Sequence, residues 1–179
     1  GYDLARLPDG KHVDTAGAAD GTVRVIEIAT GKQVRKIEAH RGGVVAVAAS
    51  PDGKLLATVN YERLIALWDA ETGTPREKLP HPLPVGGVSF SPPDGKTLAT
   101  SCWDGGVRLW DVTTAKEIGR LTGHSRRVWS VAFSPGGRWL VSGSDDHSIR
   151  VWDVESRREV RALWWHRGAV RSVAWGGTD

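Results

Sequence analysis

The chain has 179 residues, a formal net charge of +3 at pH 7 and one cysteine, Cys102. This net charge is lower than is typical of proteins that bind nucleic acids, and the arginines of the basic C-terminal part are scattered rather than clustered. A single cysteine forms no intrachain disulfide and fits a reducing compartment. No apolar run reaches the roughly 18 residues of a membrane span, and no signal peptide is visible. We therefore expect a cytoplasmic protein that binds neither nucleic acid nor membranes.

An aromatic-acidic pair recurs along the chain at a fixed interval. Trp68-Asp69, Trp110-Asp111 and Trp152-Asp153 follow one another at 42 residues (110 − 68 and 152 − 110), and Ile26-Glu27 is a degenerate copy one period earlier. A period of this length indicates one supersecondary unit that is stacked several times.

The repeat divides the chain into four full units and the first strand of a fifth. In chain order these are residues 1–39, 40–80, 81–122, 123–164 and 165–179. Each full unit holds four short apolar runs separated by turns such as Pro51-Asp52-Gly53, and no helix of ordinary length fits between them. Four short strands form one blade of a propeller. The predicted fold is all-β, a β-propeller segment of about four four-stranded antiparallel blades.

Ala39-His40 and Gly123-His124 open their units, Trp-Asp closes each third strand, and an acid lies in the turn between them. With these motifs essentially the whole chain resembles the WD-repeat (WD40) β-propeller family. Propellers close with four to eight blades, and this family most often has seven. We therefore expect an incomplete part of a larger, seven-bladed propeller. A deliberately minimal or self-assembling propeller is the alternative.

The resemblance also implies a hydrogen-bonded relay of His, Ser or Thr, acid and Trp inside each blade. The matching positions are His40, Thr58, Glu62 and Trp68; His81, Thr100, Asp104 and Trp110; and His124, Ser142, Asp146 and Trp152. A buried indole N–H needs an acceptor, and a hydroxyl can accept it while donating to an imidazole that donates to a carboxylate. Glu62 departs from the shorter Asp, and the unit with Ile26 has no indole, so we expect no full relay there.

Ser, His and Asp in one unit could also suggest a hydrolase. An active site rarely appears three times at one period, and no strand-to-helix nucleophile elbow is present. The histidines fall on successive blades and cannot share one metal ion. We therefore expect structural relays, with no catalytic residue, metal site or cofactor.

Positions that vary while the framework repeats are the candidates for partner binding. The residue before each turn acid, and two residues that bracket the first Val of each innermost strand, should face the central channel, where the family resemblance also places partners. The candidates are Tyr61, Trp103, Arg127, Trp129, Asp145 and Arg171. Tyr, Trp and Arg are enriched at interface hot spots. Alternatively, some of these aromatics fill gaps between blades, and Trp164-Trp165 packs on a neighbouring blade.

The sequence thus favours a non-catalytic scaffold whose channel face binds a protein or peptide. A regulatory segment of a larger signalling enzyme, such as a kinase or protease, is the first alternative, and a propeller enzyme is the least favoured. The other blades of a parent chain, or further copies of this one, would cover its open ends.

Overall fold

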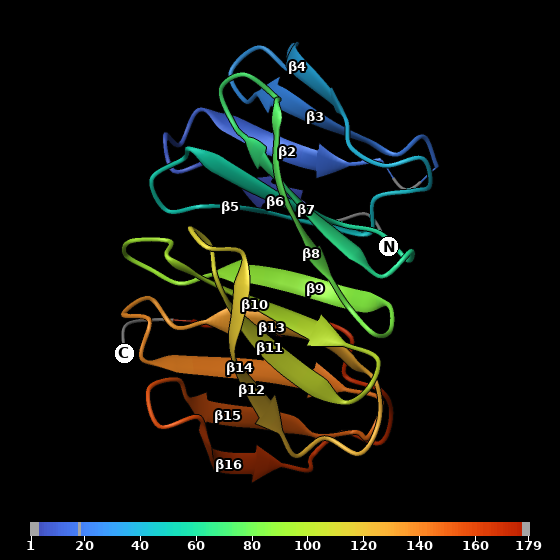
Figure 1. Cartoon of the computed structure of the whole chain (residues 1–179), viewed down its shortest axis with the longest axis vertical. Helices are drawn as coiled ribbons and strands as arrows, with labels where there is room; N and C mark the ends of the chain where they lie inside the picture. Colours follow the sequence, from blue (N-terminus) through green and yellow to red (C-terminus); the bar gives the residue numbers. More distant parts are fainter. Residues whose placement is uncertain (1–3, 18, 177–179) are drawn as a thin grey trace.

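The computed structural model describes residues 4–17 and 19–176 (Figure 1), and sixteen strands and no helix lie within them. They form four four-stranded sheets, which we call blades 1 to 4. Blade 1 contains β1 (Leu4–Arg6), β2 (His12–Ala16), β3 (Thr22–Glu27) and β4 (Gln33–Glu38). Blade 2 contains β5 (Ala46–Ala49), β6 (Leu55–Val59), β7 (Leu64–Asp69) and β8 (Pro75–Pro80). Blade 3 contains β9 (Val85–Phe90), β10 (Thr97–Cys102), β11 (Gly106–Asp111) and β12 (Lys116–Thr122). Blade 4 contains β13 (Val128–Phe133), β14 (Trp139–Ser144), β15 (Ile149–Asp153) and β16 (Arg158–Leu163).

Each blade is an antiparallel meander in which only consecutive strands pair. The register repeats, because Leu56 is paired with Trp68, Leu98 with Trp110 and Leu140 with Trp152. Blade 1 keeps this register with Val13 opposite Ile26. The fixed sequence period therefore places equivalent residues at equivalent points of every sheet.

Turn residues follow the same period. Gly53, Gly95 and Gly137 have φ values of 71°, 66° and 77° in the turns between the first two strands of their blades. Only glycine adopts this left-handed backbone without a steric penalty from Cβ. The Pro-Asp-Gly pattern thus marks real chain reversals.

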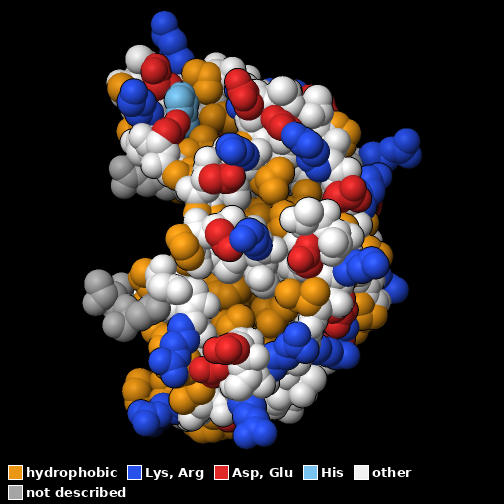
Figure 2. Space-filling model, turned by 60° about the vertical axis from the view of Figure 1, so that its left-hand side comes forward, with side chains coloured by type: hydrophobic (Ala, Val, Ile, Leu, Met, Phe, Trp, Pro, Cys, Tyr) orange, Lys and Arg blue, Asp and Glu red, His pale blue; other side chains and the backbone are white. Residues whose placement is uncertain are grey.

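The blades pack face to face through apolar clusters. The cluster between blades 1 and 2 contains Val23, Leu56 and Trp68. The cluster between blades 2 and 3 contains Ala57, Leu98 and Trp110. The cluster between blades 3 and 4 contains Ala99, Leu140 and Trp152. Each middle blade thus buries both faces, as stacked sheets require. The result is a partial propeller that forms an open arc, and Figure 2 shows the hollow along one side of it.

The innermost strands β1, β5, β9 and β13 line a central hollow of about 530 Å³ together with residues 171–173. Gly86 lets β9 approach β13 closely, because a Cβ there would lie 2.5 Å from the carbonyl oxygen of Trp129. This hollow is the channel, and it is open because the arc does not close.

Residues 164–176 contain no strand. This segment hydrogen bonds to blade 4, through Val170 N–H to the Ser144 carbonyl (2.9 Å) and Val173 N–H to Ser130 Oγ (3.2 Å). The expected strand of a further blade stays a prediction, and residues 177–179 of it lie outside the described residues. The described part of the chain also has no helix that could span a membrane.

Candidate functional site

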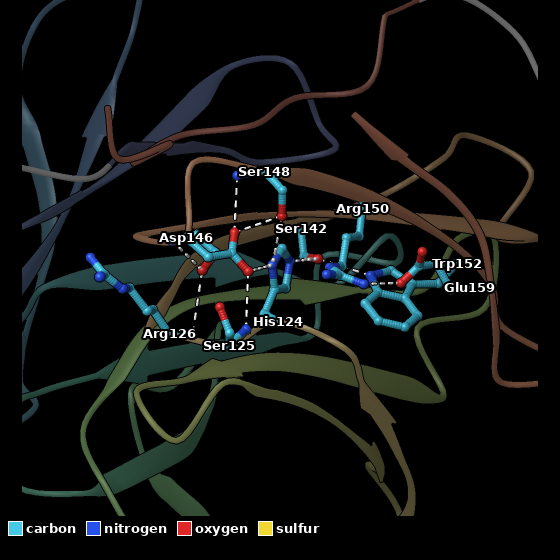
Figure 3. A network of polar contacts seen from close by, with 10 residues as sticks. His124, Ser125, Arg126, Ser142, Asp146, Ser148, Arg150, Trp152 and Glu159 are labelled. Carbon is cyan, nitrogen blue, oxygen red and sulfur yellow. Dashed lines mark hydrogen bonds and ion pairs between the residues drawn. The ribbon is translucent and has the colours of Figure 1, made fainter. Parts of the chain in front are cut away.

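Blade 4 contains a complete hydrogen-bonded chain of the predicted kind (Figure 3). Trp152 Nε1 donates to Ser142 Oγ at 2.8 Å, and Ser142 Oγ lies 2.8 Å from His124 Nε2. His124 Nδ1 lies 2.8 Å from Asp146 Oδ2. The ring therefore donates through Nδ1 to the carboxylate and accepts the serine proton at Nε2. Four side chains from the entry loop, β14, the turn and β15 are thus joined into one network.

Further donors surround the Asp146 carboxylate. Ser148 contributes its hydroxyl at 2.6 Å and its N–H at 2.9 Å, and Ser125 N–H lies 3.1 Å away. Burial alone would raise the pKa of Asp146, but the Ser148 donors, followed by His124, hold it well below its ordinary value. Burial lowers the pKa of His124, against the pull of Asp146. At neutral pH the pair is a neutral imidazole that donates to a carboxylate.

Blade 3 keeps the chain from indole to imidazole but not the link to the acid. Trp110 Nε1 donates to Thr100 Oγ1 at 3.0 Å, which lies 2.9 Å from His81 Nε2. His81 Nδ1 lies 3.1 Å from the Leu79 carbonyl oxygen rather than against Asp104. Burial, only partly offset by this bond, lowers the pKa of His81 to about 4.

Asp104 is instead bound by two arginines. Its Oδ2 accepts from Arg108 Nη2 at 2.6 Å and from Arg120 Nη2 at 2.8 Å. Burial would raise the pKa of Asp104, but the bonds from Arg108 and from Gly106 N–H lower it to about 2. The expected pairing of Asp104 with His81 is thus replaced, because the guanidinium groups are the stronger donors.

Blade 2 also lacks the acid link. Trp68 Nε1 donates to Thr58 Oγ1 at 2.8 Å, and this oxygen lies 2.8 Å from His40 Nε2. The longer Glu62 side chain accepts from Asn60 Nδ2 at 3.1 Å, and no hydrogen bond joins it to His40 among the described residues. The expected four-residue relay is therefore shortened to three members in blades 2 and 3.

Blade 1 has no relay, as its sequence predicts. Thr15 occupies the position of the relay hydroxyl and donates to the Arg24 carbonyl at 3.4 Å, as Thr58 does to the Ala66 carbonyl in blade 2. The side chain of Ile26 has no N–H that could donate to Thr15. Asp14, one residue earlier, is fully buried, and neither of its oxygens has a hydrogen-bond partner in the described part of the chain. Burial raises its pKa to about 7. No repeated motif in the sequence marks this residue.

The structure brings all six predicted channel-face residues together into one cluster, which we call the recognition face. Its members are Tyr61, Trp103, Arg127, Trp129, Asp145 and Arg171. The rings of Tyr61 and Trp103 are 5.7 Å apart between centroids, and those of Trp103 and Trp129 are 5.1 Å apart, the latter edge to face. Two turns and one inner strand supply a continuous aromatic surface.

Two guanidinium groups cover faces of these indoles. Arg127 Cζ lies 4.4 Å from the centre of the Trp103 ring, and Arg171 Cζ lies 4.4 Å from that of Trp129. Both arginines are exposed, and neither forms an ion pair within the described residues. Asp145 accepts a 2.6 Å hydrogen bond from Trp129 Nε1, which fixes that ring. The N–H groups of Arg127 and Arg171 are therefore free to bind an anion.

The aromatic residues are exposed to different degrees. Tyr61 is 54% exposed, whereas Trp103 and Trp129 are half-buried. Trp103 Nε1 is buried and has no hydrogen-bond partner among residues 4–17 and 19–176. The rings therefore pack on one another while keeping part of their surface exposed, and Tyr61 and Trp129 line the channel. Trp164 and Trp165 are 59% and 79% exposed and lie outside this cluster.

A family profile described as "WD domain, G-beta repeat" matches residues 31–69, 73–111 and 115–153, more than half of the chain. The chain belongs to this WD-repeat family. Each matched repeat spans the outermost strand of one blade and the three inner strands of the next, as in β4 with β5, β6 and β7. The WD repeats and the blades are thus out of phase by one strand.

Curated relatives share part of the chain. The small ribosomal subunit protein RACK1y of Oryza sativa subsp. japonica is 36% identical over 77 residues, which are 43% of this chain and 23% of the relative. WD repeat-containing protein SL1-17 of Schistosoma mansoni is 35% identical over 72 residues, 40% of this chain and 23% of the relative. Human angio-associated migratory cell protein is 36% identical over 70 residues, 37% and 16% respectively. The matched stretches span less than a quarter of each of these relatives.

Proposed function

We propose that the chain is a non-catalytic interaction scaffold that binds a protein or an extended peptide through the recognition face. The observation that carries this proposal is the cluster of Tyr61, Trp103 and Trp129 with two arginines that form no ion pair within the described residues. Buried aromatic and Arg anchors supply most of the binding energy at protein interfaces. WD-repeat membership supports the same role.

The stacked arginines favour an acidic segment as the partner. Their guanidinium groups already cover faces of Trp103 and Trp129, so those faces are not open to a partner's cation. The outward N–H edges can bind carboxylates in pairs. An extended acidic peptide that lies across the two arginines and rests an apolar side chain on Tyr61 fits this surface.

The buried relays support the non-catalytic part of the proposal. Ser142 has no exposed surface, so its hydroxyl cannot reach a substrate. We assign the chains of hydrogen bonds in blades 2, 3 and 4 to holding the loop before the first strand against the second and third strands. Completion of the arc by further blades, to seven in all, and a cytoplasmic location belong to this proposal too.

The test uses peptides selected from a random library against the full 179-residue chain. Trp103→Ala, Trp129→Ala and Arg127→Ala should each weaken the selected peptide by roughly 1–4 kcal/mol, the range for interface anchors. Lys54→Ala and Lys116→Ala, in exposed positions on other turns and strand ends, are the matched controls and should change little. Binding is measured by calorimetry, and thermal melts run in parallel. Unchanged affinity in a folded triple variant would exclude the recognition face.

A further inference from the structure

One position of the repeat carries arginine in three blades and alanine in the fourth. Arg24, Arg108 and Arg150 are replaced in blade 2 by Ala66, at intervals of 42 residues. All four lie on the third strand of their blade, two residues before Ile26 or a relay tryptophan. The departure therefore falls beside Trp68.

In the other blades the guanidinium is bound to an acid of the same blade. Arg24 contacts Asp20, Arg108 binds Asp104 at 2.6 Å, and Arg150 contacts Glu159. The side chains of Arg108 and Arg150 are only 5% and 12% exposed. Arg108 and Arg150 thus occupy largely buried places in their blades, whereas the Arg24 side chain is 35% exposed.

The arginine of blade 4 lies next to the relay indole. A Cβ added to Gly123 would be 2.7 Å from Arg150 Nη1, 3.0 Å from Glu159 Oε2 and 3.1 Å from Trp152 Cη2, so these three groups meet at one point. In Figure 3 Arg150, Trp152 and Glu159 gather at one end of the network. A guanidinium, an acid and an indole together fill this part of the blade.

Blade 2 lacks two of these three groups. Ala66 replaces the arginine, and Pro75 is paired with Trp68 where Glu117 is paired with Trp110 and Glu159 with Trp152. In their place is a groove of about 670 Å³ between β4 and the strands β7 and β8. Its walls include Ile37, His40, Glu62, Ala66, Trp68 and Pro75.

Two carboxylates of the groove, Glu62 and Glu77, form no ion pair among the described residues. Lys36 pairs with Glu38 at 2.6 Å, and Arg76 pairs with Asp69 at 2.6 Å. Glu62, at the position of Asp20 and Asp104, binds only the neutral amide of Asn60 by its side chain within the described residues. Arg41 and Lys78 also line the groove, and neither forms an ion pair in the described part of the chain, so net charge does not select the occupant. The selecting features are an acceptor and an indole held where the neighbouring blades hold a guanidinium.

We propose that this groove binds the side chain of an arginine from a partner protein, in place of the arginine that blade 2 lacks. The guanidinium packs against Trp68 and donates to Glu62, as Arg108 donates to Asp104 in blade 3. The site lies on the seam of blades 1 and 2 and is separate from the recognition face. Binding there depends on a planar donor group rather than on charge alone.

The test titrates the full chain with N-acetyl-arginine amide and follows the indole N–H signal of Trp68 by NMR, assigned with Trp68→Phe. The citrulline analogue has a similar shape without the charge, and the lysine analogue has the charge without the planar fork. We expect a saturable shift with the arginine compound and a response roughly tenfold weaker or less with the other two. An equal response to either analogue, or no shift with arginine, would overturn the proposal.

Two variants locate the site. Ala66→Arg should fill the groove with the chain's own guanidinium, abolish the titration and leave the melting temperature equal or higher. Glu62→Gln should weaken binding roughly tenfold. Glu155→Gln, on an exposed turn of blade 4, is the matched control and should bind as the unchanged chain does. A lower melting temperature of Ala66→Arg would show that the groove has no room for a guanidinium, and undiminished binding by either groove variant would also contradict the assignment.

Discussion

Blades 2 and 4 have the same strands and register but differ in how their polar groups are satisfied. In blade 4 the chain runs from Trp152 through Ser142 and His124 to Asp146, whose carboxylate accepts three further hydrogen bonds from Ser125 and Ser148. In blade 2 the chain ends at His40, and a groove lies beside it. The apolar framework is therefore sufficient for a blade, while the polar network is an addition that one blade can lose in part.

The largest expected contrast is between the two turn acids. Asp146→Ala should destabilise the chain by about 2–4 kcal/mol, because hydrogen bonds to a charged group contribute about 1.5–3 kcal/mol and several donors lose their acceptor. Glu62→Ala should cost about 0.5 kcal/mol or less, as for an exposed substitution. Denaturant unfolding measures both. Equal losses would mean that the acid of blade 2 contributes a structural bond that the hydrogen-bond pattern does not contain.

The second contrast is between the coupling energies of relay residues in blades 4 and 2, measured by double-mutant cycles. Trp152→Phe and His124→Ala should each cost about 1–3 kcal/mol, and together less than their sum, because both disrupt one network. The same cycle with Trp68→Phe and His40→Ala should show a smaller coupling, since the chain there stops at the imidazole. Additive losses in blade 4 would argue against a shared network. Trp165→Phe, on a highly exposed indole, is the control.

Blade 1 differs from the other blades in a buried acid that should make the stability of the fold depend on pH. Its Asp14 stands where blades 2 and 4 have Ala57 and Val141, and burial raises its pKa to about 7 against an ordinary value of 3.8. Between these values the unfolded chain binds fewer protons than the folded one at this site, so the contribution of Asp14 to stability falls as pH rises from about 4 through 7.

The groups around Asp14 act in both directions. The charge of Arg35 opposes the rise, Asp9 adds to it, and His12 opposes it weakly. Asp14→Ala should raise the free energy of unfolding by about 1–3 kcal/mol at pH 8, by removing an unpaired buried carboxylate, and should have less effect at pH 5. Denaturant unfolding of the unchanged chain and of Asp14→Ala between pH 5 and pH 8 measures this difference. An Asp14→Ala effect that does not change with pH would show that the carboxyl is not titrating there.

The fold followed from the period because repeated turns and alternating apolar runs are local signals. Trp68, Trp110 and Trp152 fix the third strand of each blade, and the Pro-Asp-Gly turns fix the reversals. The six candidates for partner binding lie in one cluster, because equivalent positions of a repeat project in one direction, and their binding role stays a prediction. The stacking of Arg127 on Trp103 and of Arg171 on Trp129 could not be predicted, since side-chain directions depend on the packing of neighbouring blades.

The acid partners could be predicted only in part. Asp104 was assigned to His81, but an arginine four residues after it, Arg108, was visible in the sequence as a competitor. The departure of Glu62 was visible too, whereas its bond to Asn60 depends on the turn geometry. Ala66 at the position of three arginines is a departure that is visible in the sequence but lies outside the motif residues of the repeat. Asp14 carries no repeat signal, because only its burial makes it unusual.

The one-strand offset between WD repeats and blades has a consequence for how such a chain can change its length. Within every blade only consecutive strands pair, so the ladder depends on cyclic order and not on where a repeat is taken to start. A genetic duplication of any 42-residue stretch, wherever its ends fall in the period, therefore adds four strands in the same order. Recombination can insert or remove a whole blade without matching its boundaries to those of the sheets.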